Sequence, residues 1–285
     1  MKHLLAMRDL PPEELKAILA LSEAPAPRVL VDKGVALYFE KPSARTRNSM
    51  ELAAAQLGGH PVYLTPAELG IGTRESVADV TRTLACYHAI IAARVFDHGL
   101  LEQMAGLNAA PVLNMLSATD HPLQALADLL TIQQLVGQID GTRIAFIGEA
   151  NNVARSLAEG CALLGARFII ASPEGYGFGG PMLAVDQVHD PFEAVEDADI
   201  IYTDVWVSMG DQPSDEKREA FERYQVDEAL MARAPSARFL HCLPAHRGEE
   251  VTAPVIDGPR SAVWRQAANR MHTARGAMLW MMGVQ

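Results

Sequence analysis

Residues 35–59 read VALYFEKPSARTRNSMELAAAQLGG, and this stretch contains the structural unit that recurs along the chain. The apolar run Val35 to Phe39 predicts a buried strand, and Arg45 to Leu57 predicts a helix. The pair Gly58-Gly59 ends that helix, because glycine readily adopts the left-handed conformation of a helix C-terminus. A strand followed directly by a helix is the repeating unit of α/β proteins.

The same alternation continues along the chain, with strands that are apolar throughout. Such strands indicate parallel sheets covered by helices on both faces. The other expected strands are Val62–Leu64, Ala89–Phe96, Val112–Leu116, Arg143–Gly148, Arg167–Ala171, Ile200–Asp204 and Arg238–Cys242. The other expected helices are a short one after Pro11-Pro12, then Ser76–Cys86, Asp97–Ala105, His121–Val136, Asn152–Leu164, Pro191–Asp197 and Trp264–Met282.

Length and glycine placement predict two domains. A chain of 285 residues suits two domains of ordinary size, and a break at Gly137–Gly141 separates two sets of strands. We therefore predict an α/β fold with two domains, each a parallel sheet flanked by helices. The stretch Pro173–Pro181, rich in glycine and proline, is expected to be a loop.

Charge and cysteine content disfavour several classes of protein. The chain has 24 Lys and Arg against 35 Asp and Glu, a formal net charge of −11, which disfavours nucleic-acid and anionic-membrane partners. Its cysteines, Cys86, Cys161 and Cys242, are odd in number and far apart, which argues against a disulfide framework and a zinc site. No apolar run reaches the roughly 18 residues of a membrane span, and the N-terminus has no signal-peptide core. These features favour a cytoplasmic protein.

Ligands of open parallel sheets bind beyond the carboxyl ends of the strands, and four such stretches carry polar chemistry here. In the first, after the strand that ends at Phe39, Ser43 can cap the next helix, while free backbone N–H groups, Arg45 and Arg47 add donors and positive charge. Together these groups are typical of a phosphate-binding site. The alternative is an ordinary capped helix with solvated arginines.

The second and third stretches follow later strands. His121 and Gln124, three residues apart at the start of a helix, can point at one ligand carbonyl, although a lone histidine there is usually a cap or a surface residue. Asp204 offers a carboxylate for a substrate ammonium, and the turn Ser208-Met209-Gly210 offers backbone groups to an amino-acid head group. This third stretch is equally compatible with an ordinary exit from a strand.

The fourth stretch, His241 to Glu250, gathers polar side chains after the last strand, with Cys242 as a conceivable thiol nucleophile. A buried cysteine followed by a solvated loop is the alternative. A metal site built from His241, Cys242 and His246 is disfavoured, because no second ligand pair has suitable spacing. Residues 148–152 lack the glycines of a dinucleotide fingerprint, so a nicotinamide cofactor is not expected.

Taken together, the four stretches resemble the aspartate/ornithine transcarbamoylase family. Ser43-Ala44-Arg45-Thr46-Arg47 resembles its Ser-Thr-Arg-Thr-Arg loop for carbamoyl phosphate, and His121-Pro122-Leu123-Gln124 resembles its His-Pro-x-Gln element. The Ser-Met-Gly loop and His241-Cys242-Leu243-Pro244 resemble the ornithine branch; the aspartate branch lacks both, and the putrescine branch lacks the Ser-Met-Gly loop. Asn151-Asn152 and Asn269-Arg270-Met271-His272 extend the resemblance over nearly the whole chain.

The resemblance implies transfer of the carbamoyl group from carbamoyl phosphate to the side-chain amine of L-ornithine. The products would be L-citrulline and phosphate, in arginine metabolism, and no metal or organic cofactor would be needed. Catalytic roles are implied for Arg45, Arg94, His121 and Cys242, of which Cys242 would orient or deprotonate the amine. The residues expected to bind the substrates are Ser43, Ala44, Thr46, Gln124, Asn152, Asp204, Ser208, Met209, Leu243 and Arg270.

The resemblance also implies which part of the chain binds each substrate. Residues 1–136, with a C-terminal helix 264–285 that returns to them, would bind carbamoyl phosphate, residues 137–263 would bind ornithine, and the protein would be a homotrimer. Three features depart from the family's pattern: Ala44 replaces a threonine, Gly70 stands where many members carry a glutamine, and residues 173–188 form a shorter segment. A relative that uses putrescine and a non-catalytic carbamoyl phosphate-binding protein are the alternatives.

Overall fold

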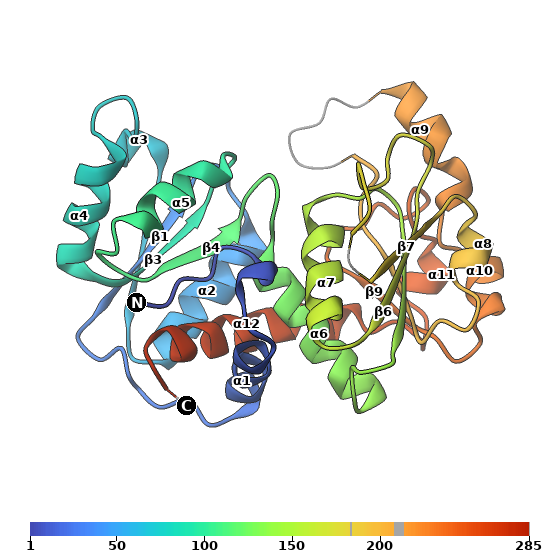
Figure 1. The fold of residues 1–285 in the computed structure, drawn as a ribbon, viewed down its shortest axis with the longest axis horizontal. Helices are drawn as coiled ribbons and strands as arrows, with labels where there is room; N and C mark the ends of the chain where they lie inside the picture. Colours follow the sequence, from blue (N-terminus) through green and yellow to red (C-terminus); the bar gives the residue numbers. More distant parts are fainter. Residues whose placement is uncertain (183, 208–213, 285) are drawn as a thin grey trace. The chain divides into compact units, whose positions relative to one another are not determined.

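The computed structural model describes residues 1–182, 184–207 and 214–284, and the chain forms two compact units (Figure 1). Unit 1 comprises Met1–Ala127 and Arg270–Gln285, and unit 2 comprises Asp128–Asn269. Helices α6 (Pro122–Val136) and α12 (Val263–Met281) carry the chain from one unit into the other, so each contributes residues to both.

Unit 1 is built on a parallel sheet with the strand order β2-β1-β3-β4. Its strands are β1 (Gly34–Phe39), β2 (His60–Leu64), β3 (His88–Arg94) and β4 (Val112–Leu116). Along β1, Ala36 and Tyr38 join the apolar cluster formed with α4 and α5, while Val35 and Leu37, on the opposite face of the strand, are also fully buried. Burial of both faces explains why this strand is an uninterrupted apolar run.

Helices cover both faces of this sheet. The apolar residues of α4 and α5 pack on one face, and α2 packs against β1 and β2. The other helices of this unit are short or lie near the N-terminus. The bounds are α1 (Pro12–Glu23), α2 (Ala44–Gln56), α3 (Pro66–Leu69), α4 (Val77–Tyr87), α5 (His98–Gly106) and the 3₁₀ helix η1 (Met7–Asp9).

The C-terminal part of α12 packs closely against α1 at Gly276. A Cβ atom at this position would lie 2.2 Å from Ser22 Oγ and 2.7 Å from the carbonyl oxygen of Ile18, so only glycine allows this approach. Arg275 donates a hydrogen bond to the carbonyl oxygen of Ser22 at 2.8 Å beside this contact. The part of α12 from Arg270 onward therefore belongs to unit 1, whereas its residues up to Asn269 belong to unit 2.

Unit 2 is built on a second parallel sheet, with the strand order β7-β6-β5-β8-β9. Its strands are β5 (Arg143–Ile147), β6 (Arg167–Ala171), β7 (Val185–Val188), β8 (Ile200–Thr203) and β9 (Arg238–His241). Its helices include α7 (Asn152–Leu163), α8 (Pro191–Ala194), α9 (Asp215–Phe221), η2 (Glu222–Tyr224), α10 (Glu228–Arg233) and α11 (Ala253–Ile256). The prediction of two parallel sheets flanked by helices is confirmed.

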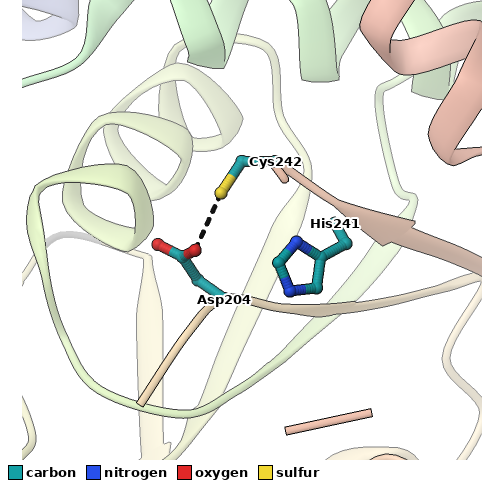
Figure 2. Close-up of side chains that lie close together, drawn as sticks. All are labelled: Asp204, His241 and Cys242. Carbon is teal, nitrogen blue, oxygen red and sulfur yellow. Dashed lines mark hydrogen bonds between the residues drawn. The ribbon is translucent and has the colours of Figure 1, made fainter. Parts of the chain in front are cut away.

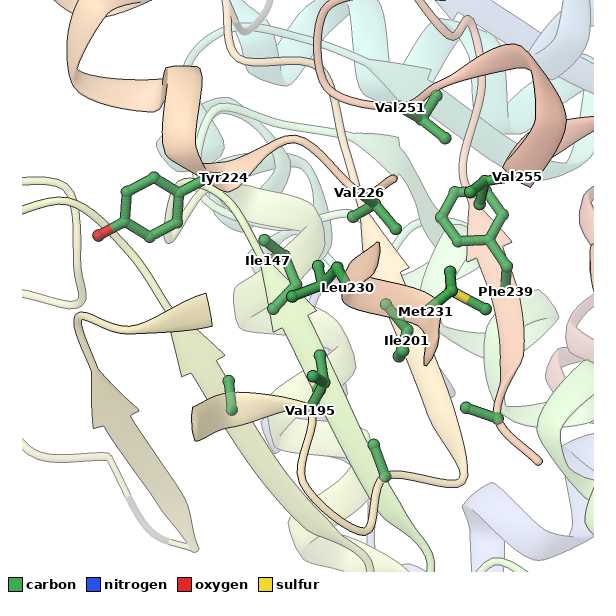
Figure 3. Close-up of a cluster of buried hydrophobic side chains, with 14 of the residues drawn as sticks. Ile147, Val195, Ile201, Tyr224, Val226, Leu230, Met231, Phe239, Val251 and Val255 are labelled. Atoms are coloured by element: carbon green, nitrogen blue, oxygen red, sulfur yellow. The ribbon is translucent and has the colours of Figure 1, made fainter. Parts of the chain in front are cut away.

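The core of unit 2 has a different composition on each face of the sheet. On one face, Ile147, Ile201 and Phe239 pack against Leu230 and Met231 of α10 (Figure 3). On the other face, aromatic rings of neighbouring strands pack together: the centroids of Phe146 and Tyr202 lie 5.2 Å apart, and those of Phe146 and Phe168 lie 6.1 Å apart. Different sets of side chains therefore pack on the two faces of the sheet.

A buried polar network fixes β8 and β9 to the two long helices within unit 2. Gln266 of α12 donates to Asp128 Oδ1 at 2.6 Å and to the hydroxyl of Tyr202 at 3.0 Å, and Tyr202 donates to Asp128 Oδ2 at 3.2 Å. The carbonyl oxygen of the Gln266 side chain accepts the backbone N–H of His241 at 3.0 Å. Each buried polar group is thus satisfied, which a low-dielectric interior requires.

The sequence missed elements that are too short or too polar for periodicity to reveal. The edge strand β7 reads Val-Asp-Gln-Val and is partly exposed, so it lacks the apolar run of a central strand. Helices α3 and α11 have only four residues each, about one turn, which leaves no repeat to detect. The helix expected over Pro191–Asp197 is present as α8, but it ends at Ala194.

Among the helices that the structure describes, none combines the length and apolarity that a bilayer crossing requires.

The close contact at Gly276 gives a stability prediction whose sign opposes helix propensity. In an open helical site, glycine to alanine stabilises by up to about 1 kcal/mol. Here Gly276→Ala is expected to lower the free energy of unfolding by about 1–3 kcal/mol, because the new methyl group meets α1. The matched control is Gly106→Ala at the end of α5, where an added Cβ has no atom within 4 Å. Urea denaturation followed by circular dichroism measures both, and equal effects at the two positions would refute the close packing.

Candidate functional site

Each sheet has one position where the strand order reverses, and the polar stretches lie at these positions. In unit 1 the chain begins at β1, moves outward to β2 and then returns to β3 on the other side of β1. In unit 2 it runs from β5 through β6 to β7 and then returns to β8 beside β5. Loops at such a switch point diverge, which leaves room for a ligand at the carboxyl ends of the strands.

In unit 1 the loop after β1 leads into the N-terminus of α2, which Ser43 caps. The Ser43 hydroxyl accepts the backbone N–H of Thr46 at 3.4 Å and donates to Thr46 Oγ1 at 3.2 Å. The first-turn N–H groups of Ala44 and Arg45 have no acceptor inside the helix, as in every helix N-terminus. The helix start therefore presents backbone donors and the positive end of a dipole to an anion.

Two buried arginines converge on the same threonine. Arg94, at the end of β3, donates to Thr46 Oγ1 at 3.4 Å, and Arg270, on α12, donates to it at 3.3 Å. Both arginines are buried, with 6% and 7% of their surface exposed. Burial, then the charge of Arg270, then that of Arg45, lower the pKa of Arg94 to about 10. Positive charge is thus crowded in a poorly hydrated place, and a bound anion would relieve the repulsion.

His121 and Gln124 face Arg270. The Arg270 guanidinium donates to Gln124 Oε1, and its Nη1 lies 3.5 Å from His121 Nε2. Burial, followed by the charges of Arg270 and Arg94, holds the pKa of His121 well below its usual value. The imidazole is therefore neutral at neutral pH, a state in which it still has one N–H to donate.

These contacts bring most of the expected carbamoyl phosphate residues of unit 1 into one cluster. Arg45 and Ala44 are exposed at the start of α2, and Arg45 is close enough to contribute to the pKa shift of Arg94. The residues joined by hydrogen bonds or close approach are Ser43, Thr46, Arg94, His121, Gln124 and Arg270.

In unit 2 a buried carboxylate lies at the end of β8. Asp204 is only 7% exposed, and Figure 2 shows the thiol of Cys242 directed at it. The Cys242 thiol donates to Asp204 Oδ1 at 2.8 Å, and Asn151 Nδ2 donates to Asp204 Oδ2 at 2.8 Å. The three residues come from the loops after β9, β8 and β5, so adjacent strands at the switch point hold them together.

Sequence reasoning assigned no substrate contact to Asn151, although its side chain joins this group. Its Oδ1 accepts the backbone N–H groups of Val153 and Ala154, both at 3.0 Å, so it caps α7. The cap fixes the side chain so that its amide N–H₂ faces Asp204. An asparagine immediately before a predicted helix is the signal that could have found it. Asn152, the residue expected to bind substrate, is the first residue of α7 and is half-buried.

The residues that follow Cys242 adopt an unusual backbone conformation. The Leu243–Pro244 peptide is cis. Leu243 itself has φ of 59°, in the left-handed region that non-glycine residues rarely occupy. Such a conformation persists only where surrounding contacts enforce it. Leu243 is half-buried beside the apolar cluster of unit 2, where its side chain packs.

The expected residues Ser208 and Met209 lie outside the described residues. The segments on either side are well anchored. Trp206 packs against Phe221 of α9, with ring centroids 6.2 Å apart, and Lys217 of α9 donates to Glu149 Oε2 at 2.9 Å. This ion pair ties the start of α9 to the loop that follows β5.

Among the residues that the structure describes, two groups of side chains have the residue types of a metal site. The ligand atoms of Asp204, His241 and Cys242 lie within 4.8 Å of one another, as do those of His246, Glu249 and Glu250. In the first group both ring nitrogens of His241 already have partners, Leu243 N–H at Nδ1 and Glu250 Oε1 at Nε2. For His241 to bind a metal together with Asp204 and Cys242, one of these two hydrogen bonds would have to break. The geometry therefore disfavours His241 as a ligand.

Gly70 has a structural role of its own in this chain. It ends α3 in the left-handed conformation, with φ of 60° and ψ of 36°, and its N–H donates to the carbonyl oxygen of Pro66 at 2.8 Å. An added Cβ would lie 2.7 Å from that of Arg74. A side chain larger than glycine at this position would therefore strain the turn as this chain forms it.

Comparison with known proteins matches both units. Residues 2–134 match the family description "Aspartate/ornithine carbamoyltransferase, carbamoyl-P binding domain", and residues 140–281 match "Aspartate/ornithine carbamoyltransferase, Asp/Orn binding domain". The chain is 44% identical to the ornithine carbamoyltransferase of Bacillus subtilis, covering 97% of this chain and 92% of that one. It is 42% identical to the anabolic ornithine carbamoyltransferase of Pyrococcus furiosus, covering 99% and 96%. The solved structure of the ornithine carbamoyltransferase from Pyrococcus furiosus superposes with a TM-score of 0.93 at 42% identity, covering 99% and 97% of the two chains.

The neutral state of His121 gives a prediction about pH. In the unfolded chain a histidine has a pKa of about 6.5, and the folded protein holds the pKa of His121 well below this value. Its contribution to stability is therefore complete above about pH 6.5 and is lost as the pH falls toward the folded pKa. Between about pH 7 and about pH 5.5, the wild-type free energy of unfolding should fall more steeply than that of His121→Gln, by up to about 1.4 kcal/mol per pH unit. Urea denaturation at the two pH values measures both proteins. If the free energy of unfolding fell equally with pH in wild type and in His121→Gln, the pKa of His121 would not be lowered by folding.

Proposed function

The chain belongs to the aspartate/ornithine carbamoyltransferase family, and from this membership we propose how its residues carry out the reaction. The chain transfers the carbamoyl group of carbamoyl phosphate to the side-chain amine of L-ornithine, giving L-citrulline and phosphate, the reaction that serves arginine biosynthesis. The reaction forms one C–N bond and breaks one C–O bond, with phosphate as the leaving group. Carbamoyl phosphate is already an activated donor, so the chemistry calls for no metal or organic cofactor.

The observation that carries the choice of ornithine is the buried carboxylate of Asp204. Ornithine at neutral pH has two ammonium groups and one carboxylate, a net positive charge, whereas aspartate has a net negative charge. A carboxylate that is 7% exposed, with Asn151 and Cys242 hydrogen-bonded to it, favours the cationic acceptor and repels the anionic one. The relatives described above are named ornithine carbamoyltransferases, which agrees with this electrostatic argument.

Unit 1 holds carbamoyl phosphate in this proposal. The N-terminus of α2, through Ser43, Ala44 and Thr46, binds the phosphate, and the crowded guanidinium groups neutralise its charge. Gln124 holds the carbamoyl amide. Ala44 contributes its backbone N–H and lacks the hydroxyl that a threonine would add. The cationic groups of this cluster are Arg45, Arg94 and Arg270.

The chemical step places negative charge on the carbonyl oxygen of the carbamoyl group. Arg45 and Arg94 stabilise this developing oxyanion by charge, and His121 donates a hydrogen bond as a neutral imidazole. Fixed donors aimed at the charge that forms in the transition state usually contribute the largest catalytic term. The low pKa of His121 suits this role, because a neutral imidazole adds a donor without adding to the crowded positive charge.

The attacking amine must be neutral, which is an energetic cost. An alkylamine has a pKa of roughly 10, so at about pH 8 the neutral form costs about 2.7 kcal/mol. Asp204 binds the α-ammonium of ornithine and orients the molecule. Cys242 orients the side-chain amine, because its own proton is donated to Asp204 and the sulfur lone pairs remain available to accept an N–H. The other residues proposed to contact ornithine are Asn152, Ser208, Met209 and Leu243.

The remaining assignments are also proposals. Residues 1–136 with 264–285 form the carbamoyl phosphate-binding domain, and residues 137–263 form the ornithine-binding domain; the family descriptions matched to the two parts support this division. Cys86, Cys161 and Cys242 form no disulfide, which supports a reducing, cytoplasmic location. A homotrimer follows from the family resemblance.

Citrulline formation from carbamoyl phosphate tests the function directly. With L-ornithine as acceptor, the protein should turn over, and with L-aspartate, putrescine or N-acetylornithine it should not. Arg45→Ala is expected to lower kcat by about 10²–10³, because it removes a charged donor to the oxyanion.

The matched control for this test is Arg233→Ala, which removes an exposed ion pair with Glu196 and should leave turnover unchanged. Turnover with putrescine equal to that with ornithine would refute the acceptor assignment. A folded protein that binds carbamoyl phosphate and turns over no acceptor would be a binding protein instead.

A further inference from the structure

We propose that His241 and Glu250 are positioning residues that fix the turn carrying Cys242 and Leu243, and so aim the Cys242 thiol at Asp204. The inference rests on the role proposed above for Cys242 in orienting the amine. In the proposed mechanism, neither His241 nor Glu250 contacts a substrate atom. Both act through the backbone of the turn.

The two side chains form a pair that solvent does not reach. Both have 0% side-chain exposure, and His241 Nε2 lies 3.1 Å from Glu250 Oε1. A buried histidine–carboxylate pair is a weak source of stability, because its desolvation offsets the attraction, and apolar residues of similar size often serve a core equally well. The presence of such a pair beside Cys242 points to a role in positioning the turn.

The tautomer of His241 is set by its contact with the turn. The backbone N–H of Leu243 donates to His241 Nδ1 at 2.8 Å, so this nitrogen accepts and the ring proton resides on Nε2, facing Glu250. One imidazole thus joins the backbone of the turn to a buried carboxylate. The backbone of His241 is itself held by Gln266, which accepts its N–H at 3.0 Å.

Glu250 holds the far end of the same loop. Its Oε1 also accepts the backbone N–H of His246 at 2.6 Å. Its Oε2 accepts no hydrogen bond from the residues that the structure describes and lies 3.8 Å from His246 Nδ1. The backbone from 241 to 246 is therefore fastened at residue 243 through His241 and at residue 246 through Glu250.

The fastened segment contains the strained residue and the functional thiol. Leu243 occupies the left-handed region, with φ of 59°, which needs enforcement by its surroundings. The hydrogen bond from its N–H to His241 supplies that enforcement. Figure 2 shows the result: the Cys242 thiol is directed at Asp204, while the ring of His241, the preceding residue, lies to one side.

Two substitutions at His241 separate its two contacts. In His241→Asn, the amide oxygen occupies nearly the position of Nδ1 and can still accept the Leu243 N–H, but the contact with Glu250 is lost. In His241→Gln, the longer amide reaches Glu250 but places no acceptor at Nδ1. If the ring positions the turn, kcat should fall by about 10² in His241→Gln and should stay within severalfold of wild type in His241→Asn. KM for carbamoyl phosphate should be unchanged in both variants, because unit 1 forms that site.

A thiol measurement tests the geometry without any substrate. In a Cys86→Ser background, Cys242 is the accessible thiol, since Cys161 is buried. Alkylation of Cys242 by iodoacetamide should be severalfold faster in His241→Gln, where the thiol is released from Asp204, and unchanged in His241→Asn. Because this readout needs neither carbamoyl phosphate nor ornithine, it remains valid if the proposed function fails.

A second pair of variants covers the case in which changes at His241 prevent folding. Glu250→Gln keeps an acceptor oxygen for both His241 and His246 and should retain the wild-type alkylation rate, whereas Glu250→Ala removes it and should accelerate alkylation severalfold. Wild-type alkylation rates in both His241→Gln and Glu250→Ala, with folding confirmed by circular dichroism, would overturn the proposal and reduce the pair to a part of the core.

Discussion

The concentration of positive charge around Thr46 is the constraint on which the rest of unit 1 depends. Two buried guanidinium groups share one hydroxyl, and burial, followed by the charges of Arg270 and Arg45, lowers the pKa of Arg94. Such an arrangement costs folding free energy in the free protein. It persists because a sheet buried on both faces holds Arg94, and because α12, packed against α1 through Gly276, holds Arg270. In the proposed mechanism, the dianionic carbamoyl phosphate supplies the missing negative charge.

Unit 2 shows the opposite electrostatic design. The site proposed for it is centred on one buried carboxylate, to which Asn151 and Cys242 donate hydrogen bonds. A cationic amino acid suits this site, as an anionic phosphate suits the other. The two units therefore use the same architecture, a loop at the switch point of a parallel sheet, for ligands of opposite charge. The chemistry then requires that the bound carbonyl carbon and the bound amine meet at attack distance.

Sequence reasoning predicted the parts of this account that depend on local pattern. The apolar runs predicted the central strands because both faces of each sheet are buried, as at Val35 and Ala36. The edge strand β7 and the one-turn helices α3 and α11 carried too little pattern to be found. At the candidate site, residue types near strand ends indicated loops that the structure brings together within each unit, but the long-range partners of their side chains could not be predicted. Neither the His241–Glu250 contact nor the sharing of Thr46 by Arg94 and Arg270 follows from spacing, because packing brings these residues together.

Binding of inorganic phosphate, measured by titration calorimetry with no second substrate, tests the central claim most directly. The claim is that crowded guanidinium groups, relieved by an anion, create the site of unit 1. The account predicts that wild-type protein binds phosphate with an affinity that falls as salt rises, and that Arg270→Gln, folded by circular dichroism, binds it more weakly by about 1.5–3 kcal/mol. Phosphate binding that is unchanged in Arg270→Gln would contradict the account.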